Sequence, residues 1–273
     1  MGAQFIGLQA WLQSPAGQRA LQWQQAQYDE VVADIFGYYA VQLGVPALDA
    51  LRANRMTKRW LVAGTHEVET EGPLPGHTAF ACEFASLPLP AQSVDLLVLP
   101  HALELAADPH AALREAERVL VPEGRIIISG FNPVSLWGLR QWRAHLWQRV
   151  GWDDLFLPDT GEFIRYQRLR DWMRLLSFEV EVGRFGCYLP AVRSPAWIER
   201  LSWMDRVGAR WWRPFGAVYF LVGVKRVRGI RLMTSAAWRR RRSLAGAPVP
   251  IANQTAPMSA AQKNHLEIRF QDR

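Results

Sequence analysis

Apolar runs of strand length alternate along this chain with segments of helical periodicity. The clearest case lies between positions 82 and 133, where residues 94–99 and 125–129 are apolar runs that flank a helical segment beginning at Asp108-Pro109. A strand, a capped helix and a second strand form a βαβ unit, which belongs to a parallel sheet covered on both faces. In open α/β sheets, ligands bind outside the carboxyl ends of the strands. We therefore expect function near Glu83, His101 and Asn132.

The same patterns predict the other elements. Ser14 is a suitable N-cap, with Pro15 at the first helical position. Apolar, β-branched and aromatic runs predict strands, and segments of helical spacing predict helices. The predicted strands are residues 38–44, 59–63, 78–84, 94–99, 125–129, 178–182 and 217–224. The predicted helices are residues 14–36, 47–55, 108–120, 134–150, 165–176 and 195–212.

The composition is that of one large α/β domain with appendages. Two cysteines, Cys82 and Cys187, give neither a disulfide framework nor a zinc pattern, so we expect no metal site and a reduced, cytoplasmic setting. The first residues show no secretory signal, and the longest apolar runs are too short for a transmembrane segment.

Charge and tryptophan are distributed unevenly. Residues 134–233 carry 17 Lys and Arg against 9 acids, and ten of the 13 tryptophans lie from Trp137 onward. A basic surface of this kind suits an anionic substrate, anionic lipid or nucleic acid, or is simply solvated. The tryptophans suit a core or lid over an apolar ligand, or contact with a membrane interface. The Arg239–Arg242 block lies in a polar segment that we expect to be disordered.

The segment from Glu83 to Pro133 resembles the second half of a class I S-adenosylmethionine-dependent methyltransferase, of the methyltransferase type 11 group. The motifs that carry the resemblance occur in the same order and at the same spacing as in the family. They are Leu87-Pro88, Val94-Asp95, Asp108-Pro109, Arg118-Val119-Leu120 and Pro122-Glu123-Gly124.

This resemblance implies the fold class, which is α/β. We expect a doubly wound, Rossmann-like sheet of seven mostly parallel strands in the order 3-2-1-4-5-7-6, with strand 7 antiparallel. It also implies S-adenosyl-L-methionine as the cofactor. The expected organisation is a helical lead-in over residues 1–36, the methyltransferase-like domain over 37–233 and the basic tail over 234–273.

The glycine-rich cofactor loop of the family is degenerate here. The run Gln42-Leu43-Gly44-Val45-Pro46-Ala47-Leu48 keeps only the first glycine, and Gln42 stands where the family has an acid. Gly44 is the cofactor-binding candidate, because a glycine lets backbone pass close to a ligand. A plain turn is the alternative interpretation.

Other candidate residues follow the third, fourth and fifth strands. Glu83 matches the family's acid that accepts a hydrogen bond from adenine, and Phe84 and Ala85 would line the adenine pocket; the alternative for Glu83 is a solvent-facing charge. His101 is expected to line the cofactor site, and it is a weak candidate for a catalytic base. Asn132 is a substrate-binding candidate or a turn former. The ends of the strands at 44, 83 and 101 are expected to converge around one crevice.

We expect methyl transfer from S-adenosylmethionine to a small acceptor that is lipophilic or anionic. The degenerate loop motivates an alternative, which is a catalytically inactive binding or regulatory protein that keeps the fold. A third hypothesis is contact with an anionic membrane surface or nucleic acid through the basic tail. The sequence names neither the acceptor nor the oligomeric state.

Overall fold

The computed structural model describes residues 2–63, 78–148, 156–158, 161, 163–192 and 194–226. The chain divides into two compact units, Met1–Val227 and Arg228–Arg273, and every described residue belongs to the first. The Arg239–Arg242 block and the rest of the expected basic tail therefore lie outside the described residues. The predicted domain boundaries at residues 36 and 233 stay predictions.

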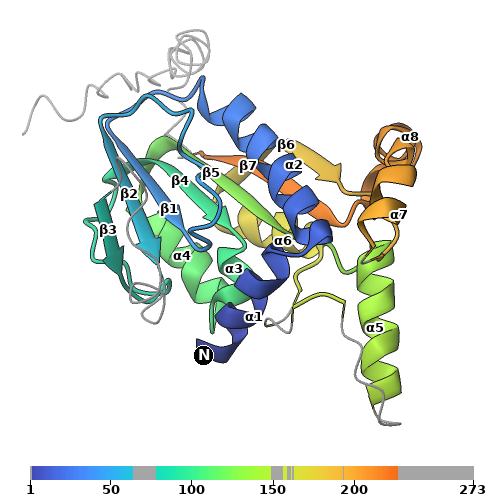
Figure 1. Ribbon diagram of the computed structural model, residues 1–273. Coiled ribbons are helices and arrows are strands. Elements are labelled where there is room, and N and C mark those ends of the chain that lie inside the picture. The colour runs from blue at the N-terminus through green and yellow to red at the C-terminus, as the bar shows by residue number, and fades with distance from the viewer. Residues whose placement is uncertain are drawn as a thin grey trace, which may run out of the picture. The chain divides into compact units, whose positions relative to one another are not determined.

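The described strands form one twisted sheet in the order β3-β2-β1-β4-β5-β7-β6 (Figure 1). β1 to β5 are parallel, and β7 is antiparallel to both β5 and β6. The predicted seven-stranded, mostly parallel α/β fold and its strand order are confirmed. The strands are β1 Tyr39–Leu43, β2 Lys58–Ala63, β3 Thr78–Ala81, β4 Val94–Pro100, β5 Leu120–Phe131, β6 Phe178–Gly186 and β7 Val218–Lys225.

Helices cover both faces of this sheet. One face packs against α4 and α6, through residues such as Leu113 and Met173. The other packs against α2, where Tyr28 and Val32 meet Val98 and other strand residues. The helices are α1 Gly2–Leu12, α2 Pro15–Val32, α3 Ala102–Leu105, α4 Pro109–Val119, α5 Leu136–Gln148, α6 Tyr166–Leu175, α7 Pro195–Arg200 and α8 Trp203–Trp211, followed by the 3-10 turn η1 Arg213–Phe215.

The predicted helix over residues 47–55 is wrong. Residues 44–57 are all described, and they form turns. The buried side chain of Gln42 accepts from the Ala50 amide at 3.0 Å and donates to the carbonyls of Val45 and Leu48. Because the Gln42 side chain forms hydrogen bonds with these backbone groups, the segment can fold without the i to i−4 backbone hydrogen bonds of a helix.

The predicted helix over residues 195–212 is interrupted. It forms α7 and α8, which are separated at Leu201 and Ser202. α1 lies within the expected helical lead-in, but its bounds were not predicted, and α3 was not expected from the sequence pattern. α1 is apolar on all sides, so its periodicity gives little signal, and α3 has only 4 residues.

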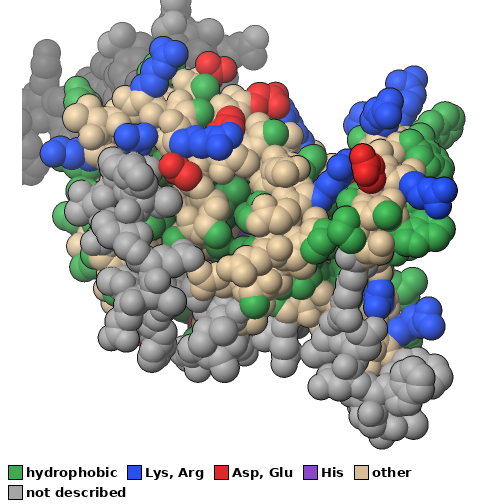
Figure 2. All heavy atoms as spheres, viewed as in Figure 1, with side chains coloured by type: hydrophobic (Ala, Val, Ile, Leu, Met, Phe, Trp, Pro, Cys, Tyr) green, Lys and Arg blue, Asp and Glu red, His purple; other side chains and the backbone are tan. Residues whose placement is uncertain are grey.

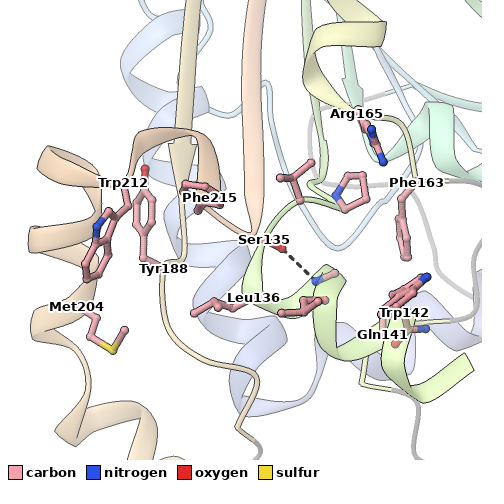
Figure 3. Close-up of a pocket in the computed structure, with 14 residues that line it drawn as sticks. Ser135, Leu136, Gln141, Trp142, Phe163, Arg165, Tyr188, Met204, Trp212 and Phe215 are labelled. Atoms are coloured by element: carbon pink, nitrogen blue, oxygen red, sulfur yellow. Dashed lines mark hydrogen bonds between the residues drawn. The ribbon is translucent and has the colours of Figure 1, made fainter. Parts of the chain in front are cut away.

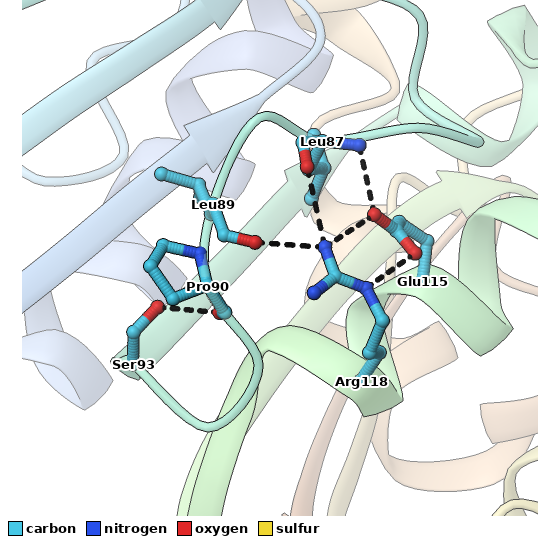
Figure 4. Close-up of polar contacts among 6 residues, drawn as sticks. All are labelled: Leu87, Leu89, Pro90, Ser93, Glu115 and Arg118. Atoms are coloured by element: carbon cyan, nitrogen blue, oxygen red, sulfur yellow. Dashed lines mark hydrogen bonds and ion pairs between the residues drawn. The ribbon is translucent and has the colours of Figure 1, made fainter.

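A hydrogen-bonded cluster joins the loop after β3 to helix α4 (Figure 4). Arg118 on α4 donates to the carbonyls of Leu87 and Leu89, at 3.2 and 2.8 Å. Glu115 accepts from the Leu87 amide at 2.9 Å and pairs with Arg118. The hydrogen bond from Arg118 holds the pKa of the Glu115 carboxyl below its usual range. The Leu-Pro and Arg-Val-Leu motifs therefore fix this loop against the helix.

Candidate functional site

The carboxyl ends of β1, β4 and β5 lie side by side, because these strands are neighbours in the sheet. Gly44 follows β1 with φ of 106°, a conformation that favours glycine. A Cβ at this position would lie 2.5 Å from the Pro100 carbonyl oxygen and 3.1 Å from the Cβ of Ala102. Close packing against the end of β4 therefore explains why this position is a glycine. The same packing places the backbone of Gly44 next to the residues that flank His101.

His101 and Glu104 form a buried pair at the end of β4. Nδ1 of His101 lies 2.8 Å from Oε2 of Glu104, and both side chains are about 1% exposed. The other carboxylate oxygen of Glu104 accepts from the backbone amide of Phe131, at the end of β5. Both His101 and Glu104 are candidates from the sequence, because both follow the fourth strand, but the sequence does not predict that the two side chains pair with each other.

The His101 pair has further contacts on both sides. The ring packs on Phe131 with 4.5 Å between centroids, and Nε2 is buried with no hydrogen-bond partner in the described structure. The side chains of Tyr219 and Glu104 both pack against Gly130, and a Cβ at this position would lie 2.6 Å from the tyrosine hydroxyl. Burial, followed by the charge of Glu104, raises the pKa of Tyr219 well above its ordinary value. His101 also has a positive φ of 56°, which is uncommon for a residue with a side chain.

The loop after Gly44 keeps its polar groups within the protein. The Gly44 amide donates to Val62 and the Val45 amide to Pro100. Val45 and Pro46 are buried. Gln42, at the family's acidic position, is 0% exposed and holds the loop as described above. This loop therefore offers few free amides to a ligand.

The N-terminal helices cover this end of the sheet. Leu8 and Leu12 of α1 lie in one apolar cluster with Val45 and Phe131. Trp11 packs edge-on against Phe131, with 5.1 Å between centroids, and its indole nitrogen donates to the Phe156 carbonyl at 2.7 Å. The region around the His101 pair is thus closed over by apolar side chains.

The predicted adenine-binding residues follow β3, two strands away from β1. Glu83 is exposed, Phe84 is buried in the core and Ala85 is half-buried. Residues 64–77, between β2 and β3 in the sequence, lie outside the described residues. The structure therefore brings Gly44 and His101 together, and places Glu83 farther along the same edge.

Asn132 follows β5 and is 2% exposed. Its side-chain amide donates to the carbonyls of Pro214 and Gly216, at 2.8 and 2.9 Å, and its oxygen accepts from the Val134 amide at 3.1 Å. These contacts join the end of β5 to the segment before β7. The geometry agrees with the turn-forming alternative, and a role in substrate binding stays a prediction.

A mostly apolar pocket of about 920 Å³ begins where β5 ends (Figure 3). It lies between α5, the segment before α6, and the α8–η1 region. Of its polar side chains, Ser135 and Gln141 are hydrogen-bonded to backbone groups, whereas Arg165 is exposed. The lining residues are Pro133, Val134, Ser135, Leu136, Gly138, Leu139, Gln141, Trp142, Phe163, Arg165, Tyr188, Met204, Trp212 and Phe215.

Ring contacts connect this pocket to the His101 pair. Phe163 in the pocket wall packs edge-on against Phe131, with 5.7 Å between centroids, and Phe131 in turn contacts His101. On the opposite wall, the Tyr188 hydroxyl donates a hydrogen bond to the backbone carbonyl of Phe185 or Arg213. Burial raises the pKa of this hydroxyl to about 12. The tryptophan-rich second half of the sequence predicts an aromatic cover but not this pocket, because the pocket walls come from segments far apart in the chain.

Comparison with known proteins agrees with this architecture. Residues 56–128 match the model of the methyltransferase domain family. The uncharacterized protein YafS of Escherichia coli (strain K12) is 42% identical over 94 residues, which span 34% of this chain and 36% of that protein. The match thus covers about a third of the length of either chain.

Two solved structures have a similar fold. A SAM-dependent methyltransferase from Thermotoga maritima has a TM-score of 0.55 at 17% identity, over 80% of this chain and 94% of that one. A chain of the complex that contains the Haloferax volcanii Trm112 methyltransferase activator has a TM-score of 0.52 at 19% identity, over 83% of this chain and 99% of that one. At these identities the likeness concerns the fold.

Proposed function

Because this chain has the fold and the domain of class I S-adenosylmethionine-dependent methyltransferases, we propose that it methylates a lipophilic acceptor bound in the pocket beside β5. The observation that carries this proposal is the position of that pocket. It begins at the carboxyl end of β5, and ring contacts through Phe163 and Phe131 connect its wall to His101. Ligands of open α/β sheets bind at this edge.

S-adenosylmethionine is the cofactor that the methyltransferase domain implies. The described residues fit it unequally. The exposed Glu83 carboxylate suits the adenine side, and the unpartnered Nε2 of His101 is a buried polar atom on the residue that follows β4. The loop after Gly44 suits it less well, because its amides bond within the protein. We infer that this chain holds the cofactor mainly from the β3 and β4 sides.

When bound, this cofactor supplies an electrophilic methyl group, and the protein's task is to orient the acceptor and exclude water. Apolar walls suit a lipophilic acceptor body, and the exposed Arg165 guanidinium suits a carboxylate or phosphate on it. A role for His101 as the base that deprotonates the acceptor requires Phe131 to move aside, because the His101 ring is 1% exposed and does not line the pocket. Glu104 is a positioning residue, because it orients the ring through Nδ1.

Calorimetry with S-adenosylhomocysteine tests cofactor binding, and transfer of labelled methyl groups into organic-soluble compounds of a cell extract tests the acceptor class. Val134→Trp, which narrows the pocket, should abolish transfer and preserve cofactor binding. Glu83→Ala should weaken cofactor binding about tenfold or more, as expected for a lost bond to a charged group. Leu175→Trp, on an exposed site of α6, is the matched control for added bulk.

The second candidate function is a binding protein without methyltransferase activity. The buried Val45 and Pro46, with the Gln42 contacts, favour it, because they fill the place of the family's glycine-rich loop. Absence of cofactor binding at millimolar concentration, with the fold intact, would support this candidate and contradict methyl transfer.

A further inference from the structure

Exposed hydrophobic side chains gather on one part of the molecule. Among the described residues, thirteen large hydrophobic side chains are strongly exposed, and nine of them lie within residues 134–142 or 197–215. Trp211 is 75% exposed, Trp142 65% and Trp203 50%. We call the surface of α5, α7, α8 and η1 the α5–α8 face. The exposed members are Val134, Leu136, Leu139, Trp142, Trp197, Trp203, Trp211, Trp212 and Phe215.

The α5–α8 face is also basic. Its helices and η1 contain six arginines and two acids, Glu199 and Asp205. Asp205 pairs with Arg19 on α2 at 3.0 Å and accepts from the Tyr188 amide, so it is directed into the protein. Figure 2 shows hydrophobic and basic side chains interspersed over α5, α7 and α8. The arginines are Arg140, Arg143, Arg200, Arg206, Arg210 and Arg213.

We propose that the α5–α8 face docks onto the surface of an anionic lipid bilayer. Indole rings are favourable at the membrane–water interface, and arginines beside them attract anionic headgroups. None of the described helices is long and apolar enough to cross a membrane, so the contact is peripheral.

The charge of the α5–α8 face argues against a second copy, and its aliphatic side chains argue against nucleic acid. A second copy of the same face would bring like charges together, since arginines outnumber acids there. Single-stranded nucleic acid binds to aromatic platforms in basic grooves. The aliphatic side chains of Val134, Leu136 and Leu139 give no such stacking, whereas they suit the acyl region of a bilayer.

The same surface contains part of the pocket wall. Leu136, Leu139, Trp142, Trp212 and Phe215 both line the pocket and are strongly exposed. Docking would therefore set the pocket against the headgroup region, from which a lipophilic acceptor can enter. This consequence for the acceptor rests on the proposed function, whereas docking itself does not require methyl transfer.

Flotation of the full chain with lipid vesicles, at physiological ionic strength, tests the proposal. The protein should float with phosphatidylcholine vesicles that contain one third phosphatidylglycerol, and much less with phosphatidylcholine alone. The double variants Trp203→Ala/Trp211→Ala and Arg206→Glu/Arg210→Glu should each reduce partitioning about tenfold or more. None of these four residues lines the pocket.

Matched controls come from exposed residues elsewhere. Phe36→Ala/Tyr38→Ala and Arg55→Glu/Arg114→Glu remove similar side chains away from this face and should leave partitioning unchanged. Failure to float with anionic vesicles would overturn the proposal. So would equal losses in test and control variants, full binding by Trp203→Ala/Trp211→Ala, or tighter binding to single-stranded RNA than to vesicles. Cofactor calorimetry on the same preparations separates failure of docking from failure of the proposed enzyme.

Discussion

His101 and Glu104 form a pair in which a carboxyl group fixes the orientation of a buried ring. Nδ1 of His101 lies 2.8 Å from the carboxyl of Glu104, whose second oxygen accepts from the Phe131 amide. With Nδ1–H donated to the carboxyl, Nε2 is the ring's acceptor, and it has no partner among the described residues. The pair also joins the ends of β4 and β5.

Loss of the Glu104 carboxyl should destabilise the fold. Glu104→Ala leaves the Phe131 amide and the His101 ring without their partner, so we expect unfolding to become easier by about 3 kcal/mol. Glu104→Gln keeps one acceptor oxygen and should cost about half as much. Urea denaturation measures both. Equal stability of Glu104→Ala and the unmodified chain would contradict the contacts described for this pair.

Gly44 should tolerate no side chain. Gly44→Ala places a Cβ 2.5 Å from the Pro100 carbonyl oxygen at a positive φ, so we expect a loss of about 3 kcal/mol from overlap and backbone strain. The matched control is Gly7→Ala in α1, where a Cβ would meet nothing within 4 Å. It should be neutral or stabilising by up to about 1 kcal/mol. Thermal unfolding of the two variants side by side gives the comparison.

The sequence predicts most of the sheet, because residues 96–99 of β4 and 126–128 of β5 are continuous apolar runs and Asp108 is a recognisable N-cap for α4. It fails over residues 47–55, where the buried side chain of Gln42 replaces helical hydrogen bonds. No local pattern reveals that contact, since it depends on where the loop folds back. The pocket beside β5 escapes prediction for a similar reason, because only tertiary packing brings Phe163 and Met204 to the walls of one cavity.

Gln42 should be intolerant of the acid that the family has at this position. In Gln42→Glu, an oxygen replaces the amide nitrogen that donates to the Val45 and Leu48 carbonyls. We expect a loss of about 2 kcal/mol at pH 7. The loss should shrink at low pH, where a protonated carboxyl keeps one donor. Gln22→Glu on the exposed side of α2 is the control and should change stability by less than about 0.5 kcal/mol. Urea titrations of both variants at two pH values decide the matter.

Tyr219 should make the fold sensitive to alkali. Burial raises its pKa above the ordinary value of 10.0, so above that pH the unfolded chain releases a proton that the folded chain retains. The unfolded state then binds fewer protons, and stability falls as pH rises. Tyr219→Phe should lose this contribution, which makes the decline between pH 10 and 11 shallower by up to about 1.4 kcal/mol per pH unit. Near pH 7 the two proteins should show equal slopes. Parallel curves in the alkaline range would show that Tyr219 ionises alike in both states.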